Sequence, residues 1–303
     1  MNSEITFPTI QKERMVIESG GLFDKTRCYA PSVLKRGDEY LMYYTGSNDN
    51  PSSRSGYRLL LARSKDGINF EKTNTPVLDM FPAAKCYSAE AYIQDCGCIG
   101  LYFALNDGTG YKIFRASTEN AEGPLSEPKL TVDTSPQFSH SVHTLRVVKS
   151  GSIYHGYVTA SSNGARSQSK KYKHYRVSAD FRIFHATSED GKTFGEFKEI
   201  ALPQHSFINI YGHSVFIRDG IVYLIFTGFD GEAGCTLHIS ASHDFVNFSE
   251  PRKLFEPEED KCEIGMYSTC VIPLDHDHWR MFYASRAAWK YRGIASALVS
   301  FEK

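Results

Sequence analysis

Hydrophobic and polar positions follow one another in short runs along this sequence, without the 3.6-residue period of an amphipathic helix. One kind of segment recurs: an aromatic residue, then small or polar residues, then an apolar run. It occurs at residues 29–33, 87–91, 138–142, 211–215 and 267–271. Short apolar runs bounded by turn residues are typical of β-strands. The pattern therefore predicts an all-β protein built from a repeat.

Two further strand-like segments follow each of these starts. The second segments lie at 40–46, 100–104, 154–158, 222–228 and 279–283, and the third at 57–62, 111–116, 181–186, 236–240 and 291–295. The ends of the third segments, Ala62, Ala116, Ala186, Ser240 and Ala295, are 54, 70, 54 and 55 residues apart. The longer third unit is explained by an insertion at 161–179, which is rich in basic residues.

A turn motif supplies a fourth strand to several units. Ser-x-Asp-x-x-x-Phe occurs at 64–70, 188–194 and 242–248, and two of the three copies contain Asp-Gly. Asp-Gly favours a tight turn because glycine tolerates a positive φ. Evenly spaced units of four short strands predict a five-bladed β-propeller. We expect a single domain over 1–303, with blades at about 29–80, 87–131, 138–200, 211–256 and 267–302, and a closing strand near 5–10.

Composition narrows the classes of partner. The 303 residues carry 34 Lys and Arg against 35 Asp and Glu, which excludes a global basic field for nucleic acid. The first twenty residues lack the apolar core of a secretory signal, and no stretch reaches the roughly 18 apolar residues of a membrane span. The seven cysteines are scattered, with one close pair at Cys96 and Cys98. We expect reduced thiols and a cytoplasmic protein, and the sequence predicts no oligomeric state.

Differences between the units indicate candidate chemistry, because the innermost strand of each blade lines the central channel. Glu90 places a carboxylate where three sister units have Ser32, Ser141 and Ser214. It is a candidate functional acid or a solvated channel residue. His140 and His213 share the neighbouring column. They fit sugar-binding donors, acid/base groups, metal ligands or histidines bonded to the backbone. The spacing is not diagnostic of a metal site, and no metal or other cofactor is predicted.

The segment before the first innermost strand contains Asp24 and Arg27. Mutual pairing would keep the acid ionised, as a base or nucleophile requires, although a loop salt bridge is the alternative. In the fifth unit, Trp289 suits stacking on a sugar face and Arg286 suits a polar group of the sugar. The rings Tyr29 and Tyr267 begin their innermost strands. The basic insertion is expected either to cover the funnel and meet an anionic group or to form a solvated loop.

Three stretches carry a family resemblance. Phe-Asp-x-x-Arg-x-Tyr-x-Pro-Ser-Val-Leu at 23–34, Tyr-Leu-Met-Tyr-Tyr-Thr-Gly at 40–46 and Leu-Ala-Arg-Ser-Lys-Asp-Gly-Ile-Asn-Phe at 61–70 resemble the five-bladed propellers of the glycoside hydrolase superfamily. That group includes families 32, 43, 62, 68 and 130. The resemblance implies a carboxylate site at the mouth of the funnel, where Asp24 matches the acid of the first blade and Glu90 that of the second.

The sequence also departs from that family. The first blade has Ala30-Pro31 where many relatives carry Asp-Pro, and the third has His140 with no carboxylate in the aligned segment. The function expected from the resemblance is an intracellular glycoside hydrolase or transglycosidase that acts on a small glycoside through Asp24 and Glu90. The remaining predicted substrate-binding residues are Arg27, Tyr29, His140, His213, Tyr267, Arg286 and Trp289.

Two alternatives remain. A glycoside phosphorylase, or an enzyme for a phosphorylated, acidic or nucleotide-linked sugar, would suit a mouth rich in His and Arg. A non-catalytic carbohydrate-binding propeller would suit the incomplete set of acids, because a fold does not by itself establish a reaction.

Overall fold

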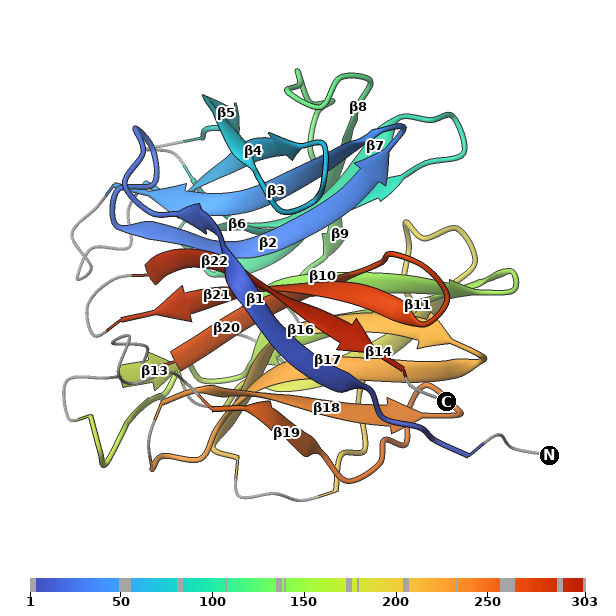
Figure 1. Ribbon diagram of the computed structural model, residues 1–303. Coiled ribbons are helices and arrows are strands. Elements are labelled where there is room, and N and C mark those ends of the chain that lie inside the picture. Colours follow the sequence, from blue (N-terminus) through green and yellow to red (C-terminus); the bar gives the residue numbers. More distant parts are fainter. Residues whose placement is uncertain are drawn as a thin grey trace.

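The computed structural model describes residues 4–48, 56–80, 84–106, 108–134, 138, 140–172, 176–178, 180–203, 207–232, 234–256, 265–287 and 291–301. These residues form five sheets of four antiparallel strands, arranged as blades around a central axis (Figure 1). The predicted all-β, five-bladed propeller is confirmed. Within the described part of the chain, no helix has the length and apolar character needed to cross a membrane.

The blades follow one another along the chain. The first contains β2 (Arg27–Arg36), β3 (Glu39–Ser47), β4 (Arg58–Ser64) and β5 (Glu71–Leu78). The second contains β6 (Lys85–Ile93), β7 (Ile99–Asn106), β8 (Tyr111–Thr118) and β9 (Lys129–Val132). The third contains β10 (Ser141–Ser150), β11 (Ile153–Ser161), β14 (Arg182–Ser188) and β15 (Lys198–Glu199).

The fourth blade contains β16 (Asn209–Arg218), β17 (Ile221–Phe229), β18 (Thr236–Ser242) and β19 (Arg252–Phe255). The fifth contains β20 (Gly265–Pro273), β21 (His278–Arg286) and β22 (Tyr291–Ser300), and its outer strand is β1 (Thr9–Glu18) from the start of the chain. Thr9 pairs with Ser300 and Ile17 with Ile294. A closing strand near the N-terminus is therefore present, but it lies beyond most of the 5–10 segment expected from the sequence.

The blades are held together by apolar side chains that face the neighbouring blade. The innermost strands contact one another in the order β2, β6, β10, β16 and β20, and β20 returns to β2. Between the first two blades, Tyr43 and Leu61 of one pack with Leu101 and Phe103 of the other, and all four are buried. Each large apolar side chain fully buried in this way contributes about 1.5–3 kcal/mol. The ring is thus stabilised by contacts that one blade alone does not provide.

The Ser-x-Asp turns join the third and fourth strands of their blades. Asp66 shows the geometry: its Oδ1 accepts hydrogen bonds from the backbone N–H groups of Ile68 and Asn69, both at 2.8 Å. These backbone bonds, Asn69 first, hold the pKa of the Asp66 carboxyl well below its ordinary value. Asp190 and Asp244 make the corresponding bonds to their own turns. The motif found in the sequence is therefore a structural device of the blades.

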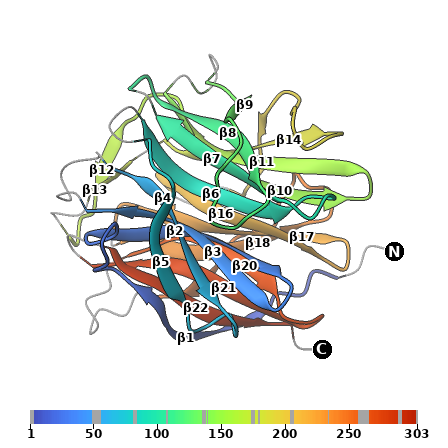
Figure 2. The same cartoon turned by 90° about the horizontal axis from the view of Figure 1, so that it is seen from above.

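The insertion in the third blade forms a small hairpin of its own. β12 (Arg166–Gln168) pairs with β13 (Arg176–Ser178) as a separate two-stranded sheet. The hairpin lies at the left end of the molecule in Figures 1 and 2, where the innermost strands begin. We call the described residues of this insertion, 162–172, 176–178 and 180, the arm, and the end of the propeller that the arm occupies the mouth.

Candidate functional site

Aromatic side chains surround the mouth, five of them near the starts of the innermost strands and three at or just before the third strands of their blades. Their rings touch in sequence, with centroid separations of 5.9 Å for Tyr57–Tyr29, 5.5 Å for Tyr29–Tyr87 and 5.7 Å for Tyr87–Tyr111. The chain continues through His143 at 4.6 Å from Tyr111 and 4.7 Å from Phe181, and then through Tyr211 to Tyr267. We call these eight residues the collar: Tyr29, Tyr57, Tyr87, Tyr111, His143, Phe181, Tyr211 and Tyr267.

The backbone that presents the collar is bent in a repeated way. In four blades the residue that follows the collar ring of the innermost strand has a left-handed φ: 54° at Ala30, 43° at Ser88, 60° at Gly212 and 45° at Ser268. The strand pairing shifts register at the same point. Such bulges redirect side chains at the rims of sheets. Here the bend turns each ring toward its neighbour in the collar.

The third blade corrects the alignment made from the sequence. Its register shift lies between Val142 and Thr144, so the collar residue of this blade is His143 and not Phe138. His140, predicted to line the channel, precedes β10 and is exposed, and its backbone N–H donates to the Ser161 carbonyl. The structural column that contains Glu90 therefore continues with Arg146 rather than with Ser141.

Arg146 lies on the axis of the propeller and was missed by the sequence alignment. Its side chain is only 2% exposed. The guanidinium donates to backbone carbonyls of all four other blades: Nε to His213 at 3.1 Å, Nη1 to Ala89 at 2.9 Å, and Nη2 to Pro31 at 3.3 Å and Thr269 at 3.2 Å. A buried cation requires such compensation. One arginine thus joins the inner edges of the five blades.

Glu90 is the counter-ion of that arginine. Its Oε2 accepts hydrogen bonds from Arg146 Nη1 and, at 3.2 Å, from Ser32 Oγ. The Glu90 side chain remains 21% exposed. Burial raises the pKa of the Glu90 carboxyl, and the ion pair with Arg146 opposes this shift. The odd carboxylate in its column therefore has a structural partner on the axis.

Asp24 lies between strands of the first blade rather than in the mouth. It is 1% exposed, its Oδ2 is 2.7 Å from Lys72 Nζ, and the Tyr44 hydroxyl donates to the same oxygen at 3.1 Å. Its Oδ1 accepts the backbone N–H of Gly21 at 2.7 Å. The expected pairing with Arg27 is absent from the contacts of the described residues. Asp24 and Glu90 share no partner among the described residues, and no contact between the two predicted catalytic acids is seen there.

His213 is also part of the core. It is 0% exposed, Nε2 donates to the Tyr157 carbonyl at 3.0 Å, and Nδ1 accepts from the Thr159 hydroxyl at 2.9 Å. Burial, reinforced by the nearby Arg146 charge, lowers the pKa of His213 to about 3. Both ring nitrogens are used by the third blade. This histidine is a neutral inter-blade contact, which corrects its assignment to substrate binding.

The remaining predicted binding residues that the structure describes lie at or beside the collar, and two arginines interact with its tyrosines. Arg27 Nη1 donates to the Tyr57 hydroxyl at 2.8 Å, and Arg286 Nη1 donates to the Tyr267 hydroxyl at 3.0 Å. Tyr29 and Tyr267 are collar members, each 3% exposed. Trp289 lies outside the described residues. The mouth therefore combines aromatic faces with two positive charges from different blades.

The arm crosses from the third blade to the fourth. The backbone N–H groups of Lys170 and Lys171 donate to the carbonyls of Gly231 and Glu232 at 2.9 and 2.8 Å. Tyr172 packs against the apolar cluster that contains Tyr29, Tyr57 and Tyr267. Through Tyr172 the insertion reaches the collar, and the expectation that it covers the funnel and meets an anionic group stays a prediction.

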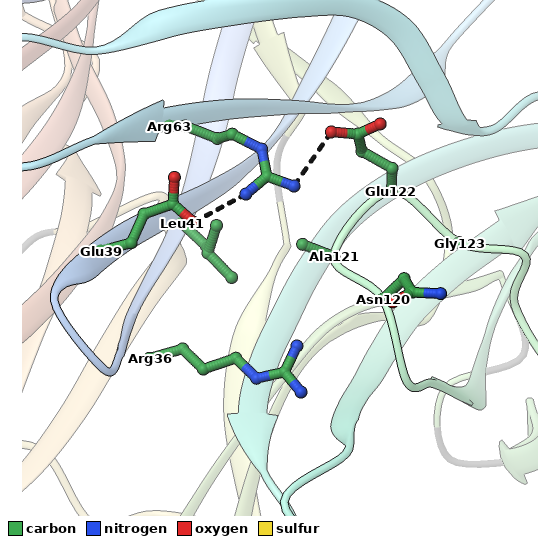
Figure 3. Close-up of a pocket in the computed structure, with 8 residues that line it drawn as sticks. All are labelled: Arg36, Glu39, Leu41, Arg63, Asn120, Ala121, Glu122 and Gly123. Atoms are coloured by element: carbon green, nitrogen blue, oxygen red, sulfur yellow. Dashed lines mark hydrogen bonds and ion pairs between the residues drawn. The ribbon is translucent and has the colours of Figure 1, made fainter.

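A separate pocket of about 440 Å³ lies at the opposite end, between the first two blades (Figure 3). Arg63 spans it, donating to Glu39 Oε2 at 2.6 Å and to Glu122 Oε1 at 2.9 Å. Arg36 lines the same pocket and donates to the carbonyls of Glu119 and Gly97. The pocket's cations are thus occupied by groups of the chain itself, and no collar residue lines it.

No model of a known protein family matches this chain. A curated relative, the sucrose-6-phosphate hydrolase of Bacillus subtilis (strain 168), is 31% identical over 114 residues, which are 37% of this chain and 21% of the relative. The aligned segment thus spans about a fifth of that protein.

Solved structures match over nearly the whole chain. A thermostable family-43 glycoside hydrolase has a TM-score of 0.67 at 14% identity, covering 93% of this chain and 92% of its own. A structure from the GH130 family of mannoside phosphorylases, which contains glycoside hydrolases that target β-1,2 mannosidic linkages in Candida mannan, has a TM-score of 0.69 at 14% identity, with coverages of 98% and 95%. An N-acetylgalactosamine deacetylase from F. plautii has the same score, identity and coverages.

These neighbours share the fold. The chain has the five-bladed propeller architecture of glycoside hydrolases, as the resemblance implied. The deacetylase shows that proteins with different reactions match this fold equally well. The reaction therefore has to be argued from the residues at the mouth.

Proposed function

We propose that this protein is a glycosidase-type enzyme that takes a small glycoside into the mouth of the propeller. The observation that carries the proposal is the collar, a continuous belt of aromatic rings contributed by all five blades. Sugar rings present C–H faces that pack against aromatic faces. Tyr87, His143 and Tyr211 are only partly buried and offer that surface.

The collar also favours a sugar that carries a negative charge. Arg27 and Arg286 reach it from the first and fifth blades and already donate to tyrosine hydroxyls there. A guanidinium is the side chain best suited to bind carboxylate or phosphate, through paired N–H groups. A phosphorylated or acidic glycoside is therefore the substrate class that this mouth fits best.

The chemistry rests on the acid that remains at the axis. Glycoside hydrolysis requires one carboxyl group to protonate the leaving oxygen and a second to activate water or attack carbon. Glu90 retains an exposed fraction and a raised pKa, which suit a proton donor. We assign the acid role to Glu90 and a structural role to Asp24, whose oxygens are occupied by Lys72, Tyr44 and Gly21.

A second candidate, a carbohydrate-binding propeller without hydrolysis, is favoured by one specific observation. The residue after the innermost collar ring has no carboxylate in the first four blades, where it is Ala30, Ser88, Thr144 and Gly212. Among the described residues, no second carboxylate accompanies Glu90 at the axis. Binding at the collar would be retained in such a protein, and turnover would not occur.

The test separates the two candidates with one panel of neutral, acidic and phosphorylated glycosides. Binding is measured by calorimetry, and product release by chromatography with and without inorganic phosphate. Tyr87→Ala and Tyr211→Ala are expected to weaken binding at least tenfold. Tyr154→Ala is the matched control, because Tyr154 lies in the hairpin at the opposite end of the third blade.

The outcomes are distinct. Turnover that Glu90→Gln abolishes while binding persists supports the enzyme, and turnover that Glu90→Gln leaves unchanged overturns the assigned acid. Binding without turnover of any glycoside in the panel selects the carbohydrate-binding candidate. Equal affinity of Tyr87→Ala, Tyr154→Ala and the unmodified protein for every bound glycoside contradicts the collar as the binding surface.

A further inference from the structure

Two cysteines share one turn at the end of the propeller opposite the mouth. The turn 94–98 joins β6 to β7, and in it Cys96 is exposed while Cys98 is partly exposed. The other described cysteines, Cys28, Cys86, Cys235 and Cys270, are buried. Buried thiols pack as small apolar groups, whereas a pair of accessible thiols in one turn has no packing role.

The turn brings the two cysteines into a geometry that allows a bond. The backbone N–H of Gln94 donates to the Cys98 carbonyl at 2.9 Å, and that of Gly97 to the Gln94 carbonyl at 2.8 Å. Gly97 has a φ of 78°, which favours glycine between the two cysteines. Residues two apart have Cα atoms at most about 7 Å apart, and a closed turn shortens this into the range of about 4.4–6.8 Å that disulfides occupy.

The two sulfurs have different surroundings. The Cys98 backbone N–H donates to Cys96 Sγ at 3.4 Å. Hydrogen bonds from the Cys98 thiol and from this N–H lower the pKa of Cys96, while donating its proton to Cys96 raises the pKa of Cys98. Arg36, which also lines the pocket of Figure 3, donates to the Gly97 carbonyl between them at 3.2 Å. One thiol is thus prepared to act as a nucleophile and the other is held beside it.

We propose that Cys96 and Cys98 form a reversible dithiol–disulfide site that reacts with small-molecule disulfides. The Cys96 thiolate attacks one sulfur of the disulfide, forms a mixed disulfide and releases the first thiol. Cys98 then loses its proton and attacks Cys96 Sγ, which closes the Cys96–Cys98 disulfide and releases the second thiol. In sum, two protein thiols and one small disulfide become one protein disulfide and two small thiols.

The inference does not depend on the proposed function at the mouth. The turn belongs to the β6–β7 hairpin, whereas the collar residue of this blade, Tyr87, lies at the start of β6. Reaction at the dithiol is measured on the thiols themselves and requires no substrate for the mouth. Failure of either proposal leaves the other open to its own test.

The experiment uses the full chain with Cys262→Ser, because Cys262 lies outside the described residues and its thiol is removed from the measurement. The native protein is incubated with oxidised glutathione and quenched with iodoacetamide, and its tryptic peptide 86–112 is sequenced by mass spectrometry. That peptide contains Cys86, Cys96 and Cys98, so the buried Cys86 is an internal control. We expect the peptide to lose two hydrogens at Cys96 and Cys98, with Cys86 left unoxidised.

Single variants assign the roles. Cys98→Ser is expected to accumulate a glutathione adduct on Cys96, because no second thiol displaces it. Cys96→Ser is expected to form its adduct at least several times more slowly. The proposal is overturned if the parent protein accumulates a stable glutathione adduct without an internal disulfide, if it does not react, or if the two single variants react at equal rates.

Discussion

The third blade and its four sisters have the same strands but differ at the axis. In the sisters, the collar ring is a tyrosine and the next residue has a left-handed φ. In the third blade, the ring is His143, and Thr144 after it is absent from the left-handed set. Three positions beyond the ring, the sisters carry Ser32, Glu90, Ser214 and Cys270, while the third blade carries Arg146.

The comparison shows that the axis of a repeated fold is stabilised by residues that differ between the repeats. Identical blades would leave the inner carbonyls of every strand facing a shared channel without donors. One blade supplies a single cation that bonds to carbonyls of the other four, and the second blade supplies the carboxylate that accompanies it. The five blades are therefore equivalent in their sheets and not in their contribution to the axis.

The largest expected effect comes from Arg146→Met, which removes the charge and all five donor contacts of this side chain. Unpaired carbonyls and an unpaired Glu90 would remain in a mostly buried site. We expect the free energy of unfolding to fall by about 3–5 kcal/mol, as measured by urea denaturation. Adding Glu90→Gln should restore part of the loss, since it removes the orphaned charge. A loss below about 1 kcal/mol would show that the axis is not held by this residue.

Gly212→Ala tests the left-handed position of the sister blades. Gly212 has a φ of 60°, and a Cβ there would lie 2.9 Å from the Ser268 backbone nitrogen of the next blade. We expect a loss of about 1–3 kcal/mol in unfolding free energy, from strain and from displacement of that strand. Gly195→Ala is the control: its φ is not left-handed, and the nearest atom to its Cβ would be the Thr187 carbonyl oxygen at 3.7 Å. Equal losses in the two variants would contradict the argument.

The last effect depends on pH, with a slope of at most about 1.4 kcal/mol per pH unit, and it concerns the boundary between the third and fourth blades. His213 has a pKa of about 3 in the folded protein, against about 6.5 when unfolded. Below pH 6.5 His213 binds a proton in the unfolded chain but stays neutral in the folded protein. The free energy of unfolding therefore falls as the pH decreases from 6.5 toward 3. His213→Gln should flatten this part of the profile of unfolding free energy against pH. The exposed His140→Gln is the control, and matching profiles for the two variants would disprove the assignment.

The propeller could be predicted from the sequence because the third strands and the turns that follow them recur at regular spacing. The third strands end on small residues at nearly constant spacing, and the Ser-x-Asp turns mark the step to the fourth strand. These signals arise from local backbone chemistry and from apolar side chains facing a neighbouring blade. Turn chemistry and apolar strand patterns can both be recognised from residue types close together in the sequence. The strands could therefore be predicted without information on long-range contacts.

The candidate site was harder to predict because its alignment depends on backbone conformation. Of the left-handed residues after the collar rings, only Gly212 is a glycine, while Ala30, Ser88 and Ser268 give no such signal. Phe138 followed by small residues imitated the start of a strand, and the true ring, His143, was passed over. With the correct register, Glu90 and Arg146 occupy the same position of two neighbouring blades and carry opposite charges. That alignment would have predicted an ion pair on the axis.

Asp24 and His213 show a second limit of sequence reasoning. A structural aspartate and a catalytic aspartate cannot be told apart from residue type. The structural role of Asp24 follows from the Lys72 and Tyr44 side chains that contact it after folding. The two nitrogens of His213 are likewise occupied by a neighbouring blade. Contacts between segments distant in the sequence decide both cases, and a single sequence does not record them.

The closing strand has a consequence for how the protein is made. Thr9–Glu18 is synthesised before the other strands of all five blades, yet its partner, Tyr291–Ser300, follows every other strand of the described residues. Until then the early strand has an unpaired edge, and among the strand pairs of the described residues the one that completes the circle joins the segments farthest apart in the sequence. Such pairings form late and slowly. The ring is therefore expected to assemble blade by blade and to lock in a final, rate-limiting step, during which the waiting strand is the region most exposed to chaperones and to aggregation.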